Sequence, residues 1–122
     1  MGKEREIELE TLYMGGGTPS IMTSMQLSRV INTIKKHTGQ WKNCELTVEM
    51  DPGTFSKEKL QEYQELGVSR ISMGIQTFQK NEFSSLGRGH SFSQVMQSLD
   101  IILESGFNLD QVSIDLMLGI PY

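Results

Sequence analysis

Two periodicities alternate along the chain and constrain what it can fold into. Four short segments are rich in apolar residues, as strands are, and between them apolar residues recur three and four positions apart, as on a helix. Strands that alternate with helices predict right-handed crossovers between parallel strands. The sequence therefore predicts an α/β fold with strands at about residues 7–14, 45–50, 70–76 and 112–118, and with helices at about 23–37, 57–66, 79–86 and 92–105.

Composition limits the classes of partner. The net charge of −4 and the pI of about 5.1 argue against a general nucleic-acid binder. No window approaches the roughly 18 apolar residues of a membrane span, so we expect no integral membrane segment. The first six residues, "MGKERE", resemble neither a signal peptide nor a presequence. We expect a cytoplasmic protein, or a mitochondrial one if a longer form carries a presequence.

Each predicted strand ends in glycine or a polar residue. In parallel α/β architectures, ligands bind at the carboxyl ends of the strands, which lie together at one edge of the sheet. We therefore expect one ligand site there, built from the segment Gly15–Thr18 and from Glu49, Gln76 and Asp115.

The run Gly15-Gly16-Gly17 contains more glycine than a turn requires. Backbone without side chains can approach a ligand closely, and its N–H and C=O groups can bind a zwitterion or an anion. The alternative is a flexible connection between strand and helix. The run is not a phosphate loop, because no Gly-Lys-Ser/Thr follows, and Ser20 breaks the G-x-G-x-x-G pattern.

Single polar residues each allow two interpretations. Glu49 could accept hydrogen bonds from an amine or from ribose hydroxyls, or it could lie on the solvated face of an edge strand. Asp115, inside the apolar run "VSIDLML", is expected to be buried and therefore paired or ligand-facing. Gln76 offers a donor and an acceptor. Arg88 could clamp a carboxylate or be a surface charge, and His90 fits a structural loop or cap residue.

Five segments carry a family resemblance. In order, they are "YMGGGTPS", "VEMDPGT", "GVSRISMGIQTF", "LGRGH" and "VSIDLMLGIP". Together they resemble the radical S-adenosylmethionine proteins related to oxygen-independent coproporphyrinogen III oxidase, from about residue 11 to the C-terminus. The resemblance implies a partial (β/α)₆ barrel of about four parallel strands, as a single incomplete core domain over residues 1–122.

The resemblance also implies a cofactor, S-adenosylmethionine, and the residues that would bind it. The glycine motif is expected to contact the amino and carboxylate groups at the methionine end. One acid contacts the same ligand, an amide and a second acid face the ribose side, and an arginine pairs with the carboxylate. In this sequence these positions are Gly16, Gly17 and Thr18, then Glu49, Gln76, Asp115 and Arg88.

One family feature does not occur in this sequence. The family holds a [4Fe-4S] cluster through a C-x-x-x-C-x-x-C loop upstream of the first strand, and the single Cys44, which we interpret as a small apolar residue, cannot replace it. We expect no catalytic or metal-binding residue in this chain and a cluster only in a full-length form. The chain is thus expected to be inactive alone, as a fragment, a truncated gene model or an alternative product of a longer protein.

The segment "GRGH" bears on the branch of the family. It resembles the Gly-Arg-x-His form of the haem-chaperone-like branch, which implies haem as a ligand. The alternatives are oxidative decarboxylation of coproporphyrinogen III to protoporphyrinogen IX, with a porphyrinogen as ligand, and a non-catalytic fragment. The sequence does not indicate an oligomeric state or decide whether the protein is an enzyme.

Overall fold

A four-stranded parallel sheet forms the centre of the chain. The computed structural model describes residues 7–87 and 89–120. The strands follow one another across the sheet in the order β1-β2-β3-β4, each parallel to its neighbour. This confirms the predicted α/β class. The strands are β1 (Thr11–Met14), β2 (Glu45–Met50), β3 (Val68–Gln76) and β4 (Val112–Leu116).

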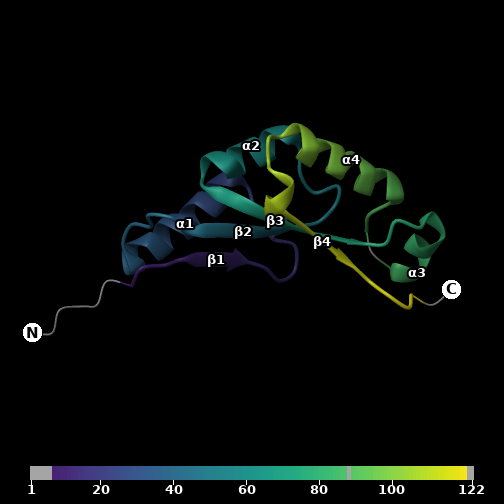
Figure 1. Cartoon of the computed structure of the whole chain (residues 1–122), viewed down its shortest axis with the longest axis horizontal. Helices are drawn as coiled ribbons and strands as arrows, with labels where there is room; N and C mark the ends of the chain where they lie inside the picture. The colour runs from purple at the N-terminus through teal and green to yellow at the C-terminus, as the bar shows by residue number, and fades with distance from the viewer. Residues whose placement is uncertain (1–6, 88, 121–122) are drawn as a thin grey trace, which may run out of the picture.

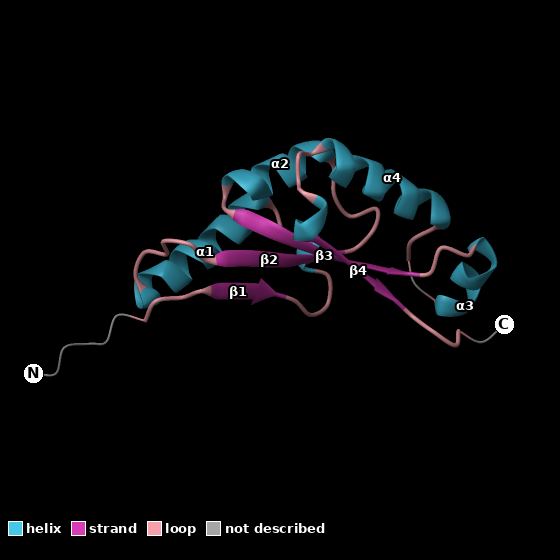
Figure 2. Cartoon of the chain, in the orientation of Figure 1, coloured by secondary structure: helices cyan, strands magenta, loops and turns pink. Residues whose placement is uncertain are grey.

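The helices cover one face of this sheet and leave the other bare (Figures 1 and 2). The main helices are α1 (Ser24–Thr38), α2 (Lys57–Glu65) and α4 (Phe92–Glu104). In a barrel of parallel strands, helices form the outer ring and the opposite sheet face lines the interior. The open sheet therefore has the form of a partial barrel whose inner face is accessible. The shorter elements are α3 (Phe83–Leu86) and the 3₁₀ turns Pro19–Ile21, Lys80–Glu82 and Leu109–Gln111.

Alternation along the strands separates an apolar face from a polar one. Residues on the helix side are buried in one cluster with helix residues such as Leu27, Leu60 and Val95. On the other side, which we call the open face, the side chains are mostly polar. The helix side carries Leu46, Val48, Met50, Ile71, Met73 and Ile75, and the open face carries Tyr13, Thr47, Glu49, Arg70, Ser72, Ser113 and Asp115.

Local signals start and stop the helices where the sequence places them. The Thr23 hydroxyl accepts a hydrogen bond from the N–H of Gln26, whose side chain bonds back to the Thr23 N–H. Ser91 and Gln94 form the same capping box on α4. None of the helices in the described ranges has the length and hydropathy needed to cross a membrane.

Strand ends differ from their predicted positions. The first strand starts at Thr11 instead of residue 7, because its pairing with β2 begins at Thr11–Glu45. The third starts at Val68, two residues before the prediction, and the fourth ends at Leu116 instead of residue 118. The predicted helix at 79–86 is a 3₁₀ turn followed by the four-residue α3. In each case the partner strand or the hydrogen-bonded turn sets the boundary.

Strand β4 is an edge strand with an apolar surface. Ile114 and Leu116 face the helix side but remain exposed, and Leu118 beyond them is 94% exposed. No described element covers them, since the last crossover helix, α4, precedes this strand. Unpaired edges that carry apolar side chains promote association with other chains.

Candidate functional site

The glycine loop after β1 meets Glu49 at the carboxyl end of β2. The Gly16 N–H donates a hydrogen bond to Oε2 of Glu49, with 3.1 Å between nitrogen and oxygen. The Tyr13 hydroxyl donates to Oε1 of the same carboxylate over 2.8 Å. Strand β2 lies between β1 and β3, so Glu49 is on a central strand and not on an edge strand. Its side chain is half-buried. Two of the predicted site positions are thus in direct contact.

The three glycines meet two different physical demands. A Cβ on Gly15 would lie 2.8 Å from Oε1 of Glu49 and 2.8 Å from a ring carbon of Tyr13, so a larger residue would displace one of these two side chains. Gly16 and Gly17 have open space around them but φ angles of +88° and +58°. Side chains of L-residues disfavour such angles, and glycine does not. Glycine is therefore favoured at every position in the run, for space at Gly15 and for conformation at Gly16 and Gly17.

Ser20 fastens the loop to the turn that follows β2. Its fully buried hydroxyl accepts a hydrogen bond from the Asp51 N–H at 3.1 Å and pairs with the Thr54 hydroxyl at 2.5 Å. The Lys59 ammonium group donates to the Ser20 carbonyl, and burial lowers the pKa of Lys59. Thr18, half-buried, opens the 3₁₀ turn through its carbonyl, which accepts the Ile21 N–H. These contacts anchor the end of the loop to the turn.

Gln76 ends β3 in a strained backbone conformation. Its φ of +73° is the only positive value outside glycine among the described residues, and its side chain is buried. The sheet register shifts between Gly74 and Gln76, and the Gln76 carbonyl accepts the Met117 N–H at 2.8 Å. Strain in a non-glycine residue needs surrounding support and clusters at ligand sites. This is independent support for Gln76 as a candidate ligand residue.

Two other predicted positions have different outcomes. Asp115 lies on the open face beside Gly74 but is exposed, so the expectation of a buried acid is wrong. An apolar run predicts burial only where both strand faces are covered, and none of the described elements covers the open face of β4. Arg88 lies outside the described residues. His90 is buried and packs edge-on against Phe83 at 5.9 Å between ring centroids, consistent with a structural role.

On the open face near the loop, neighbouring side chains shift the pKa of Tyr13. The nearby Ser72 hydroxyl lowers the pKa of Tyr13, but partial burial of the phenol and the Glu49 and Asp115 carboxylates together raise that pKa above its ordinary value. These four side chains come from all four strands. Side chains from all four strands thus lie near one another on this face.

Sequence reasoning missed Tyr13 and Ser20 as site residues. Each acts through a partner more than thirty positions away, namely Glu49 or Thr54. Tyr13 was visible only as one aromatic residue in a strand, and Ser20 only as a break in a dinucleotide motif. The alternation that puts Tyr13 on the same face as Glu49 was the one available signal.

The residues do not supply a metal centre. In the described ranges, no group of three or more His, Cys, Asp or Glu side chains is placed to hold a metal ion. Burial raises the pKa of Cys44, which disfavours the thiolate that a metal would need. A [4Fe-4S] cluster therefore does not fit the described part of the chain. S-adenosylmethionine fits better, because the loop and Glu49 offer oxygen acceptors and a negative charge.

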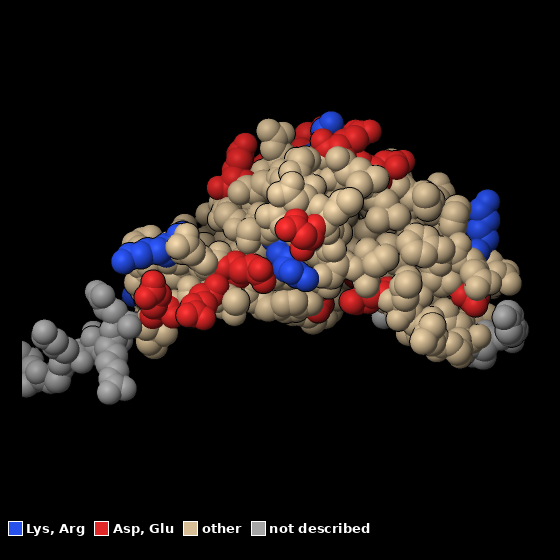
Figure 3. Space-filling model, in the orientation of Figure 1, with Lys and Arg blue, Asp and Glu red and all other residues tan. Residues whose placement is uncertain are grey.

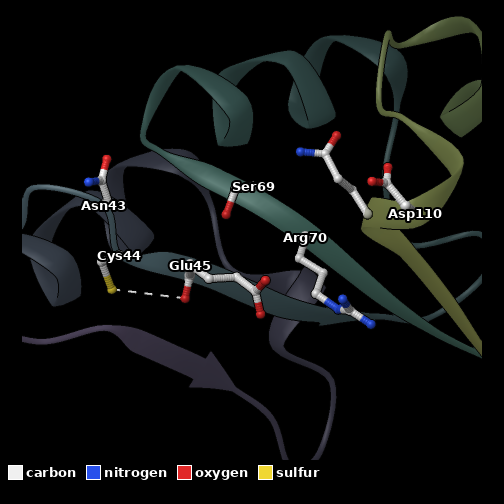
Figure 4. Close-up of a pocket in the computed structure, with 7 residues that line it drawn as sticks. Asn43, Cys44, Glu45, Ser69, Arg70 and Asp110 are labelled. Carbon is white, nitrogen blue, oxygen red and sulfur yellow. Dashed lines mark hydrogen bonds between the residues drawn. The ribbon is translucent and has the colours of Figure 1, made fainter.

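A separate hollow of about 520 Å³ lies at the opposite ends of the strands (Figure 4). Cys44, Glu45 and Asp110 contribute to its lining, and the Arg70 guanidinium donates to the Ser113 hydroxyl at 2.7 Å. The Ser69 hydroxyl accepts the Leu46 N–H where the register of β2 and β3 shifts. On the face shown in Figure 3, acidic and basic side chains are interspersed, without a broad basic patch.

Comparison with curated proteins finds relatives over nearly the whole chain. The chain is 36% identical over 113 residues to "Heme chaperone HemW" of Synechocystis sp., covering 93% of this chain and 27% of that protein. It is 38% identical over 117 residues to "Heme chaperone HemW" of Lactococcus lactis, covering 95% and 30%. The chain thus spans less than a third of the length of these relatives.

A solved structure shares the fold. Coproporphyrinogen III oxidase (HemN) from Escherichia coli, described as a radical SAM enzyme, matches with a TM-score of 0.79 and 29% identity, covering 93% of this chain and 26% of that chain. The profile of the Radical SAM superfamily matches residues 2–122. From this match and the shared fold we conclude that the chain belongs to the radical SAM superfamily.

Proposed function

We propose that this chain binds S-adenosylmethionine where β1, β2 and β3 end, as part of a haem-chaperone-like radical SAM protein. Membership of the superfamily implies this cofactor and a [4Fe-4S] cluster for the family in general. The observation that supports binding here is the Glu49 carboxylate, held against the glycine loop by Tyr13 and Gly16.

The chemistry of this acceptor set suits the ammonium group of the ligand. An ammonium group has three donors and no acceptor, and a carboxylate keeps lone pairs free when two donors already bind it. The Gly16 N–H is engaged by Glu49 and the Thr18 carbonyl accepts the Ile21 N–H, so the Gly16 and Gly17 carbonyls are the loop acceptors left for a ligand ammonium group. Glu49 and the carbonyls at Gly16 and Gly17 would therefore bind the amino group, with charge-assisted hydrogen bonds to Glu49. Thr18 is proposed for the same end of the ligand on the basis of the resemblance.

The other proposed roles rest on the resemblance. Gln76 and Asp115 are proposed for the ribose side, and Arg88 for the ligand carboxylate. S-adenosylmethionine supplies a reactive sulfonium group when bound. The proposed role of this chain's residues is to bind and orient that ligand. The proposal does not involve a [4Fe-4S] cluster, because the described residues do not hold one.

The haem-chaperone branch is favoured by the relatives. Two proteins named heme chaperones are 36% and 38% identical to the chain. Because the chain spans less than a third of each, haem binding is proposed for a longer protein that contains it. The second candidate is decarboxylation of coproporphyrinogen III, which the similarity to the Escherichia coli oxidase favours. The third is that the chain by itself is a non-catalytic binding fragment.

Titration calorimetry with S-adenosylmethionine tests the binding proposal. Replacement of Glu49 by Gln removes the charge that would pair with the ammonium group, and hydrogen bonds to charged groups contribute about 1.5–3 kcal/mol when well shielded. Because Glu49 is only half-buried, we expect about a tenfold loss of affinity. Glu45→Gln, on the same strand but at its other end, is the matched control and should bind like the unmodified chain. No measurable binding, or equal affinity in the two variants, would contradict the proposal.

Two assays on a longer protein separate the haem proposals. Absorbance titration measures haem binding, and product analysis measures decarboxylation of coproporphyrinogen III. Stable haem binding without decarboxylation supports the chaperone proposal. Turnover supports the oxidase instead.

A further inference from the structure

Tyr13 and the loop together fix both oxygens of the Glu49 carboxylate. Strand register pairs Tyr13 with Thr47, so the Tyr13 ring must lean along β2 to reach Glu49, two residues further on. Its hydroxyl then donates to Oε1 at 2.8 Å while the Gly16 N–H donates to Oε2 at 3.1 Å. A glutamate side chain held at both oxygens has already lost most of its rotamer freedom before any ligand arrives.

Gly15 is part of the same arrangement. A Cβ at this position would lie within 2.8 Å of both Oε1 of Glu49 and the Tyr13 ring. The Tyr13–Glu49 hydrogen bond therefore lies directly against the backbone at Gly15. A side chain there would displace one partner or both.

We propose that Tyr13 is a positioning residue, which orients the Glu49 carboxylate for a ligand ammonium group across the backbone of Gly15. This rests on the proposed function, which supplies the ligand. The interaction is preorganised in the free chain, and preorganisation raises affinity because less freedom is lost on binding. Tyr13 acts through Glu49 and does not itself need to touch the ligand.

A double-mutant cycle measured by calorimetry tests this role. Tyr13→Phe keeps the ring and removes the hydroxyl, so we expect S-adenosylmethionine to bind about three- to tenfold more weakly. If Tyr13 acts only through Glu49, the same substitution has no further effect in a Glu49→Ala background. Gly15→Ala, which displaces the carboxylate by contact, should weaken binding at least as much as Tyr13→Phe. Thermal unfolding of each variant checks that the fold is intact.

The titration of Tyr13 gives a readout that does not depend on the ligand. The groups that face this phenol are Ser72, Glu49 and Asp115, and the two carboxylates raise its pKa. Carbon-13 NMR of labelled tyrosine, assigned with Tyr13→Phe, should show a raised pKa that falls in Glu49→Gln. A tyrosine pKa that does not respond to Glu49→Gln would refute the contact itself.

The outcomes distinguish the two proposals. Binding that weakens in Tyr13→Phe only when Glu49 is present supports the positioning role. Binding that Tyr13→Phe leaves unchanged, or an effect that persists in Glu49→Ala, overturns it. If the unmodified chain binds no S-adenosylmethionine, the proposed function fails, and a pKa that responds to Glu49→Gln would still support Tyr13 as the residue that orients this carboxylate.

Discussion

Ser20 offers a quantitative test of how the glycine loop is held. In Ser20→Ala the Asp51 N–H loses its acceptor, because the Ser20 hydroxyl is the partner that it has in the structure. Thr54 is affected less, since its hydroxyl still donates to the Asp51 carbonyl at 2.6 Å. One half-buried donor is therefore left without an acceptor, at a cost of about 1–3 kcal/mol. For a chain of this size, that corresponds to a fall in Tm of very roughly 4–12 °C.

Urea unfolding followed by circular dichroism measures this loss. Ser28→Ala is the control, because Ser28 is on the surface of α1 and only accepts a long hydrogen bond, of 3.4 Å, from Asn32. We expect that control to change the free energy of unfolding by no more than about 0.5 kcal/mol. Ser20→Ala should also weaken binding of S-adenosylmethionine, because the loop is then free to move. A loss of stability no larger than that of the control would refute the reasoning that Ser20 fastens the loop to the turn.

Three further results are expected. Gln76→Gly relieves the positive φ of +73°, so we expect the free energy of unfolding to change by no more than about 1 kcal/mol. The same substitution should weaken the binding of S-adenosylmethionine. A clear loss of stability would argue against strain at this position. Burial raises the pKa of Tyr63 above its ordinary value of 10.0, so its phenol stays neutral in the folded chain at a pH where it ionises in the unfolded chain. The free energy of unfolding should therefore fall as the pH rises past 10.0. Urea titrations at several pH values should show a smaller fall for Tyr63→Phe. Anaerobic reconstitution of this 122-residue chain should give no [4Fe-4S] cluster, and a cluster absorbance band with stoichiometric iron and sulfide would contradict the expectation.

The order and direction of the strands were predictable from the sequence. Alternating periodicities specify parallel crossovers, and a strand such as Glu45–Met50 carries that pattern within itself. Strand ends were less predictable because they depend on partners. Met117, for example, lies just beyond β4 although its N–H still donates to the carbonyl of Gln76, where β3 ends.

The candidate site was predictable only in part. Polar residues at strand ends indicated Glu49 and Gln76, since such positions share one edge of a parallel sheet. The contacts that orient Glu49 depend on the register between β1 and β2, which one sequence does not specify. Asp115 was predicted to be buried because apolar neighbours usually indicate a strand that is covered on both faces. In the described part of the chain no layer covers the open face of β4, and the residues around Asp115 do not indicate this. The ligand roles of these residues remain predictions.

The glycine loop also has a consequence for chirality. At Gly16 and Gly17 the backbone adopts angles that suit residues of the opposite hand, so the conformation alone would accept D-alanine there and resist L-alanine. At Gly15 the objection to L-alanine is contact with Glu49 and Tyr13 and does not concern the backbone angles. Glycine suits all three positions, because it has no side chain to contact Glu49 and it adopts positive φ angles without strain. Chemical synthesis of the segment with D-alanine at 16 or 17 would separate the demand for space from the demand for handedness.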